Sequence, residues 1–192
     1  MMDAPQGDQV KQEAIMAAAM AVMCQYGFRR TSMEDIARAA GMSRPALYQH
    51  FRNKEDIARR MVDVYFETAA KAVAEVLAED GPVADLLARA FAAKTGPLLR
   101  EMLESPHGAD LLDLKDSHAR DEVAAGTARL TGVFAAWLAR EVQRGRVVLE
   151  GTPEETAALI LGALDGIKQP PFEQFEAQRA RLARLLARGL TE

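Results

Sequence analysis

Polar side chains that can read nucleic-acid bases gather in one short segment, residues 44–50, with the sequence Arg-Pro-Ala-Leu-Tyr-Gln-His. With helical spacing, Leu47 and Phe51 fall on one side and turn inward, which leaves the polar residues on the opposite side. There the fork of Arg44 can donate to O6 and N7 of guanine, and Gln49 can pair with adenine. A phosphate contact is the alternative for Arg44, and simple solvation is the alternative for Gln49. The segment therefore indicates recognition of DNA by a helix in the major groove.

The residues on either side have the caps and the turn of a helix-turn-helix. Thr31 and Glu34 have the spacing of a capping box, which predicts that a first helix begins at Thr31. Gly41 stands where that helix must end, because a left-handed terminal residue costs least as glycine. Ser43 can cap the second helix, and Asn53 can cap a third. An arrangement of this kind presents its second helix to the major groove.

Four further residues are expected to approach DNA. Pro45 and Ala46 are small and apolar, which suits a thymine methyl group or a close approach of the backbone. Thr31 and Ser32 can contact phosphates through their hydroxyls and through helix-terminal N–H groups. Capping of the first helix explains Thr31 and Ser32 equally well, and the two roles are compatible.

The ordered series from Gly27 to Glu55 resembles the N-terminal domain of the TetR-type (TetR/AcrR) transcriptional regulators. The matching residues are Gly27-Phe28, Thr31-Ser32, Ile36-Ala37, Ala40-Gly41-Met42-Ser43, Leu47-Tyr48, Phe51 and Lys54-Glu55. One departure is Met23, where the family usually places an aromatic residue, and it changes core packing rather than function. The rest of the chain matches only in length and helical organisation.

The resemblance implies a function as well as a fold. Tyr48, His50 and Lys54 occupy positions that such regulators use to hold phosphates. One helix-turn-helix buries too little surface for high specificity, so a homodimer on a near-palindromic operator in double-stranded DNA is also expected. The family's second domain senses a small molecule, here expected to be apolar. The expected activity is that of a ligand-responsive repressor that this effector releases from DNA, without a cofactor and without enzymatic activity.

The composition bounds the class of protein. The chain has 192 residues, of which 49% are hydrophobic, and this is enough for a substantial core. No apolar run approaches the roughly 20 residues that span a bilayer, and the polar N-terminus lacks a signal-peptide pattern. A cytoplasmic location is therefore expected. The single cysteine, Cys24, excludes an intrachain disulfide framework and is interpreted as a packing residue.

The net charge of −4 is unevenly distributed along the chain. Residues 29–60 contain eight basic and four acidic residues, a net of +4. Residues 61–192 contain fifteen basic and twenty-one acidic residues, a net of −6. Basic charge thus surrounds the segment that is expected to contact DNA, as a phosphate-binding footprint requires. Chance variation among solvated faces is the alternative.

Helical patterns run through the whole chain, so the expected fold class is all-α. We expect an N-terminal helix-turn-helix domain, residues 1–56, and a larger C-terminal domain for ligand sensing and dimerisation, residues 57–192. The boundary falls within one long helix, residues 54–78. Pro97 is expected to kink or divide the helix at residues 84–104. The other expected helices span residues 10–26, 109–114, 116–143, 153–167 and 172–188.

A stripe of small residues predicts a dimer interface in the C-terminal domain. Ala158, Gly162 and Gly166 are spaced four residues apart, so one helix face is nearly bare and two helix backbones can approach closely. Packing inside one subunit is the alternative. The partners expected from the last helix are Phe175, Leu182, Leu185 and Leu186.

Large apolar residues of the central helices are interpreted, as a set, as the lining of an effector pocket. The set consists of Phe91, Met102, Leu103, Leu111, Phe134 and Trp137. For each residue alone an ordinary core position is the better interpretation, and the family resemblance is what favours a pocket.

Metal and catalytic chemistry find little support in the sequence. His107 and His118 lie eleven residues apart without a tight ligand spacing, so no metal site is expected. We find no phosphate loop, nucleophile elbow or His-Glu-x-x-His motif. Two other functions stay open. One is a helical enzyme or carrier that uses the C-terminal pocket, and the other is a protein-interaction adaptor whose helix-turn-helix is only structural.

Overall fold

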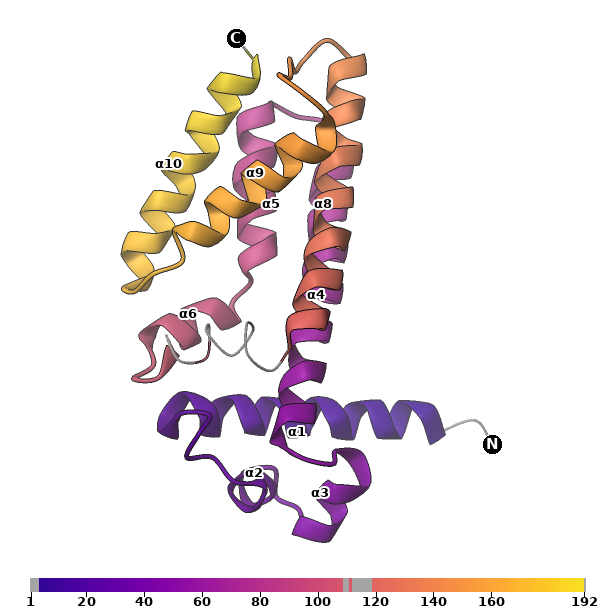
Figure 1. The fold of residues 1–192 in the computed structure, drawn as a ribbon, viewed down its shortest axis with the longest axis vertical. Helices are drawn as coiled ribbons and strands as arrows, with labels where there is room; N and C mark the ends of the chain where they lie inside the picture. Colours follow the sequence, from indigo (N-terminus) through magenta and orange to yellow (C-terminus); the bar gives the residue numbers. More distant parts are fainter. Residues whose placement is uncertain (1–3, 109–110, 112–118, 192) are drawn as a thin grey trace. The chain divides into compact units, whose positions relative to one another are not determined.

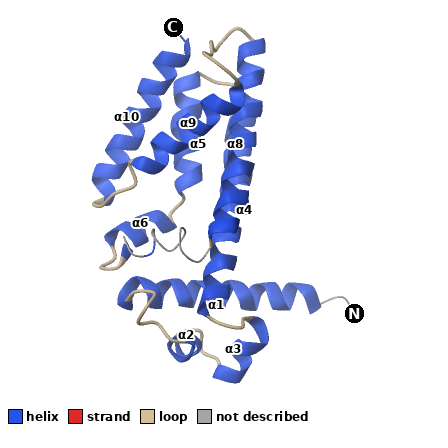
Figure 2. Cartoon of the chain, in the orientation of Figure 1, coloured by secondary structure: helices blue, strands red, loops and turns tan. Residues whose placement is uncertain are grey.

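The computed structural model describes residues 4–108, 111 and 119–191 of the chain. Within these ranges every regular element is an α-helix, as Figures 1 and 2 show, and the all-α prediction is confirmed. The helices are α1 (Ala4–Tyr26), α2 (Met33–Ala39), α3 (Arg44–His50), α4 (Lys54–Ala78), α5 (Val83–Thr95), α6 (Leu98–Glu104), α8 (Arg120–Gln143), α9 (Pro153–Gly166) and α10 (Phe172–Thr191).

The observed helices agree with the expected ones except at their ends. The first helix begins at Ala4 rather than Val10, and the last continues to Thr191 rather than Arg188. The expected helix at residues 109–114 and the expected start of the next one, at Asp116, lie mostly outside the described residues. In the described part this next helix, α8, begins at Arg120.

Pro97 divides the helix that the sequence placed at residues 84–104. Helix α5 ends at Thr95, and Gly96 follows with a φ of 62° before α6 begins at Leu98. A left-handed residue is favourable only for glycine, and Pro97 lacks the N–H that would continue the helix. The predicted break is therefore confirmed as a complete separation into two helices.

The chain divides into two compact units. Unit 1 comprises residues 1–64 and 104–123, and unit 2 comprises residues 65–103 and 124–192. Helices α4 and α8 each contribute residues to both units. The sequence placed a single boundary between residues 56 and 57, and that functional boundary stays a prediction.

The core of unit 1 is formed by apolar residues from each of its first four helices. Ile15 and Met23 on α1, Ile36 on α2, Leu47 on α3 and Ile57 on α4 are at most 1% exposed. Met23, the departure from the family pattern, thus fills a core position. Because each of the short helices α2 and α3 has an apolar anchor, the outer face of α3 is held in a fixed orientation.

The core of unit 2 includes a close approach between α4 and α8. A Cβ atom built on Gly126 would lie 2.1 Å from Cγ of Phe66, well inside van der Waals contact. Phe91 on α5 and Phe134 on α8 are fully buried, with ring centroids 6.3 Å apart. The absence of a side chain at Gly126 is therefore what allows the Phe66 ring to pack against the α8 backbone.

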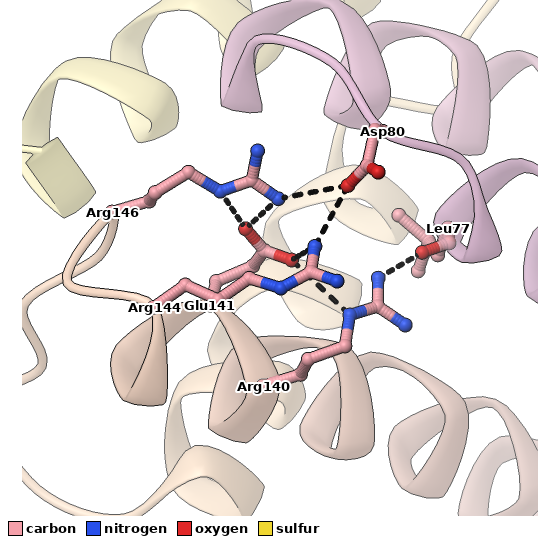
Figure 3. A network of polar contacts seen from close by, with 6 residues as sticks. All are labelled: Leu77, Asp80, Arg140, Glu141, Arg144 and Arg146. Carbon is pink, nitrogen blue, oxygen red and sulfur yellow. Dashed lines mark hydrogen bonds and ion pairs between the residues drawn. The ribbon is translucent and has the colours of Figure 1, made fainter.

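A buried carboxylate joins the ends of α4 and α8 within unit 2 (Figure 3). Glu141 is fully buried and forms ion pairs with Arg140, Arg144 and Arg146. Arg140 also donates to the carbonyl of Leu77 in the last turn of α4, and Arg146 reaches Asp80 at 3.7 Å. The charged donors offset the cost of burying Glu141, and one of them satisfies a helix-terminal carbonyl.

Candidate nucleic-acid interface

The turn between α2 and α3 is fixed by a glycine and a cap. Gly41 has a φ of 66°. The N–H of Met42 donates to the carbonyl of Ala37 at 2.9 Å, and the N–H of Gly41 donates to the carbonyl of Arg38 at 3.2 Å. These two bonds form a Schellman ending of α2. Ser43 then caps α3 by accepting from the N–H of Ala46 at 3.3 Å, as predicted.

The cap of α2 lies one residue later than the sequence predicted. Ser32, not Thr31, is the N-cap, and its hydroxyl accepts from the N–H of Asp35 at 3.2 Å. The Asp35 carboxylate in turn accepts from the hydroxyl and the N–H of Ser32, and these hydrogen bonds lower the pKa of Asp35. Thr31 is instead buried, and its hydroxyl donates to the carbonyl of Gly27 at 2.9 Å. This corrects the predicted Thr31–Glu34 capping box.

The face of α3 that the sequence assigned to DNA points outward. Arg44, Pro45, Tyr48 and Gln49 are exposed. Ala46 and His50 are half-buried, and Ser32 is exposed at the start of α2. The buried anchors lie on the opposite side, where Leu47 is fully buried. A continuous outer face of arginine, tyrosine and glutamine can approach base edges and phosphates together.

Two neighbours pre-position the Arg44 side chain. Its Nη2 donates to the Tyr48 hydroxyl at 3.4 Å, and its guanidinium carbon lies 5.6 Å from the centre of the Tyr48 ring. Glu34 on α2 lies 3.9 Å from Nη1. The hydrogen bond to Tyr48 raises the pKa of Arg44. The side chain keeps 58% of its surface exposed, so most of its donors remain open to a ligand.

Lys54 has partners that the sequence did not predict. Its ammonium donates to the carbonyls of Phe28 at 2.8 Å, Thr31 at 3.0 Å and Arg29 at 3.3 Å. It also lies 4.7 Å from the centre of the Phe28 ring. Its three donors thus tie the start of α4 to the turn that follows α1. A phosphate contact by Lys54 stays a prediction, and it would compete with these carbonyls.

Residues distant in sequence complete unit 1, and no local motif signals them. A Cβ atom on Gly27, whose φ is 81°, would lie 3.3 Å from Nδ1 of His107. Arg59 on α4 approaches Glu122 on α8 at 3.9 Å. His118, the second histidine considered for a metal site, lies outside the described residues.

The residues predicted to line an effector pocket lie in the core. Phe91, Phe134 and Trp137 are at most 2% exposed, and Leu103 and Leu111 are also buried, whereas Met102 is half-buried. Leu111 belongs to unit 1 and the others belong to unit 2. Their burial fits the core interpretation that the sequence allowed for each residue, and their role as a pocket stays a prediction.

Most of the residues predicted to form a dimer interface are accessible. Ala158, Gly162, Gly166 and Leu185 are exposed, and Leu182 and Leu186 are half-buried. Phe175 differs because it is fully buried in its own subunit, where it packs against Phe172. As placed here, Phe175 is a core residue rather than a contact for a second chain.

Comparison with known sequences connects this geometry to a family. Residues 15–61 match the family model described as "Bacterial regulatory proteins, tetR family". The chain is also similar to the HTH-type transcriptional repressor ComR of Escherichia coli (strain K12), with 34% identity over 124 residues. That match covers 57% of this chain and 59% of ComR, so the chain spans less than two thirds of this relative.

Solved structures with the same fold cover nearly the whole chain. The fatty acid degradation regulator FadR from Bacillus halodurans has a TM-score of 0.74 and 18% identity, over 99% of this chain and 98% of that one. The transcriptional regulator FadR from Bacillus subtilis, solved in complex with stearoyl-CoA, has a TM-score of 0.73 and 17% identity, over 93% and 98% of the two chains. Of the helices in the described ranges, none has both the length and the apolar character of a membrane span.

Proposed function

We propose that this chain, which belongs to the tetR family of bacterial regulatory proteins, is a transcriptional repressor that binds DNA through the outer face of α3. The observation that carries the proposal is the combination of an exposed, pre-positioned Arg44 with a buried Leu47 on the same helix. This is the arrangement by which a recognition helix presents its side chains to base edges.

Two copies of the chain act together in this proposal. One helix-turn-helix buries too little surface for high specificity, so a dimer should read two half-sites about 34–36 Å apart, one helical turn of DNA. The surface proposed for dimerisation is the bare face of Ala158, Gly162 and Gly166 with the leucines of α10. Its accessibility supports this assignment, because Leu159 and Leu185 are 74% and 54% exposed.

The repressor is proposed to respond to a small-molecule effector in unit 2. The stearoyl-CoA complex of a protein with the same fold supports such a site. Helix α4 is continuous from Lys54 to Ala78 and contributes residues to both units. A continuous helix can convert a displacement in unit 2 into a change of spacing between the two recognition helices. A cytoplasmic location and the absence of enzymatic activity are parts of the same proposal.

Selection of DNA from a random duplex library by the full-length protein tests the function. The expected result is enrichment of one near-palindromic sequence whose binding weakens steeply as salt is raised. Enrichment of no sequence would contradict the proposal and would favour the adaptor or the enzyme and carrier alternatives.

The same DNA tests the effector response. An effector that releases the repressor must, by linkage, bind more weakly in the presence of the operator by the same factor, typically about 5–150-fold. Titration with and without operator DNA measures this factor, and Trp137 offers a fluorescence signal because it is the single tryptophan. Equal affinities in the two titrations would show that the compound binds without coupling.

A further inference from the structure

Unit 2 contains two buried ammonium groups that share one carboxylate. Lys94 on α5 and Lys168, just after α9, both donate to Oδ1 of Asp165, with Nζ–Oδ1 distances of 2.7 Å and 2.6 Å. The Lys94 side chain is 2% exposed and the Lys168 side chain is 8% exposed. Water therefore cannot solvate either charge well, and burial of an unbalanced charge is costly.

The contacts seen among the described residues add no second carboxylate to this cluster. Tyr65 on α4 donates its hydroxyl to the carbonyl of Lys94 at 3.1 Å. Arg179 on α10 donates to the Thr95 hydroxyl at 2.9 Å and lies 3.6 Å from Glu176, so that pair is neutral by itself. Counted over the described residues alone, the cluster thus holds one positive charge in excess when both lysines are protonated.

The excess positive charge shifts the pKa values of Lys94 and Asp165. Burial, followed by the charge of Lys168, lowers the pKa of Lys94 to about 7. Burial acts to raise the pKa of Asp165, but the two lysines outweigh it and lower that pKa to about 2. At neutral pH Asp165 is therefore ionised, whereas Lys94 carries its proton only part of the time. A second anion beside Lys94 would stabilise the protonated form.

The other cationic cluster of unit 2 shows why burial matters. Around Glu141 and Asp80 three arginines also exceed two carboxylates (Figure 3). Those arginine side chains, however, are 33–44% exposed. Solvent can stabilise that excess charge without a ligand. The lysines that share Asp165 lack this access, so their excess charge is relieved either when Lys94 releases its proton or when an anion binds beside it.

We propose that Lys94 and Lys168 bind an organic monoanion of the carboxylate class, whose charge completes the cluster. Its role as the effector rests on the function proposed above. One excess positive charge matches one carboxylate. Asp165 keeps 48% of its side chain exposed, which brings the cluster to the protein surface. The effector is then an amphipathic acid, which adds one charged group to the apolar molecule that the sequence led us to expect.

The residues next to Lys94 indicate where the apolar body of such an acid would lie. Phe91 precedes Lys94 by three residues on α5, so the two side chains are neighbours on one helix face. Phe91 is fully buried against Phe134. The aromatic core of unit 2 therefore begins one helical turn from Lys94.

A ligand-binding role and a purely structural role for Lys94 predict opposite changes in stability when Lys94 is replaced. A cation in the last turn of α5 interacts favourably with the helix dipole, so its loss should destabilise the protein if that is its purpose. A ligand site predicts that Lys94→Met leaves a balanced Lys168–Asp165 pair. The variant should then unfold at the same temperature as the wild type or higher.

The test compares the wild-type protein with Lys94→Met and with the control Lys71→Met, which replaces an exposed lysine of α4. The probes are acetate, benzoate and decanoate, each beside the neutral amide of the same carbon skeleton, titrated by calorimetry at pH 7. At least one carboxylate should bind the wild type and Lys71→Met more tightly than its amide. Lys94→Met should weaken that binding about ten- to a hundredfold, the value of a charged hydrogen bond.

Two results would overturn the site. One is a wild type that binds no carboxylate better than its amide, and the other is equal carboxylate affinity in wild type and Lys94→Met. Should Lys94→Met fail to fold, Asp165→Asn tests the same site. This change removes the carboxylate that competes for the two lysines, so it must tighten the binding of an added carboxylate, and unchanged or weaker binding would overturn the site. The DNA selection described above is independent of these titrations. If the protein selects an operator but binds no carboxylate, only the proposed carboxylate site is wrong. If it binds a carboxylate but selects no operator, only the proposed function is wrong.

Discussion

Arg44 and Lys54 carry the same charge within one motif, yet their surroundings give them different tasks. The Arg44 side chain keeps 58% of its surface exposed, and its guanidinium carbon lies 5.6 Å from the centre of the Tyr48 ring. All three donors of Lys54 have carbonyl partners in the turn after α1. The sequence alone cannot separate the two cases, because those carbonyls lie 23–26 residues away along the chain.

Arg44→Ala should weaken binding to the selected operator by about 1–3 kcal/mol and relax the preference at one base position in each half-site. The physical reason is loss of an exposed, pre-positioned fork at the start of α3. Binding of the variant to a library of single-base operator changes measures both effects. Arg129→Ala, which removes an exposed arginine of α8, is the control. Equal weakening on every sequence would identify Arg44 as a phosphate contact instead.

Lys54→Met should lower the free energy of unfolding by about 1–3 kcal/mol, because three carbonyls lose a charged donor. Thermal unfolding measures this, with Lys11→Met on the exposed side of α1 as the control. The salt dependence of operator binding distinguishes the roles. The quantity to compare is the slope of the logarithm of the binding constant against the logarithm of the salt concentration. A slope shallower by about one in Lys54→Met would support the phosphate contact that the family resemblance implies. An unchanged slope together with lower stability would support a positioning role alone.

At the scale of elements, the sequence predicts those features that depend on local spacing. The inward side of α3, the end of α2 at Gly41 and the separation of α5 from α6 follow from periodicity, glycine and proline. The cap of α2 shows the limit. Thr31–Glu34 and Ser32–Asp35 have the same spacing, and only burial of Thr31 against the Gly27 carbonyl decides between them.

Gly126→Ala should destabilise the protein by about 1–3 kcal/mol, because the new methyl group would overlap the Phe66 ring and force α4 and α8 apart. Gly132→Ala is a matched control on the same helix, where a Cβ would meet nothing within 4 Å. That change should be neutral, or stabilising by up to about 1 kcal/mol through helix propensity. Chemical denaturation of both variants measures the difference. Equal effects would mean that α4 and α8 do not approach closely at Gly126.

At the scale of the whole molecule, contacts between distant segments set what the sequence could not predict. The proposed carboxylate site joins α5 to a residue 71 positions later, and no motif relates Lys94 to Asp165. The small-residue stripe of α9, by contrast, is visible in the sequence because it lies on one helix. The burial of Phe175 had no such signal, since helical spacing does not reveal which apolar face meets the core.

Gly162→Leu should shift the protein from dimer to monomer while its helical content persists. Within one subunit a Cβ at Gly162 meets nothing within 4 Å, so the larger side chain is tolerated in the monomer and clashes only with a second copy. Sedimentation velocity measures the assembly state, and circular dichroism measures the helices. Gly132→Leu, also open within the subunit, is the control. A Gly162→Leu variant that stays dimeric would place the interface on another surface.

The stability of the molecule should also depend on pH through Lys94. The pKa of Lys94 is about 7 in the folded protein, against an ordinary value of 10.5. Between these values the unfolded chain binds a proton at Lys94 that the folded protein has released. The free energy of unfolding should therefore rise with pH across this range, because the cost of removing that proton on folding falls as the pH approaches 10.5. The other titratable groups around Lys94 are present in both the wild type and Lys94→Met, so their contributions cancel in the comparison. These groups are Tyr65, Asp165, Lys168 and Arg179. The difference between the two unfolding profiles from pH 6 to about 9.5 isolates Lys94. The wild type should gain stability relative to the variant as pH rises, and parallel profiles would show that Lys94 keeps its proton throughout.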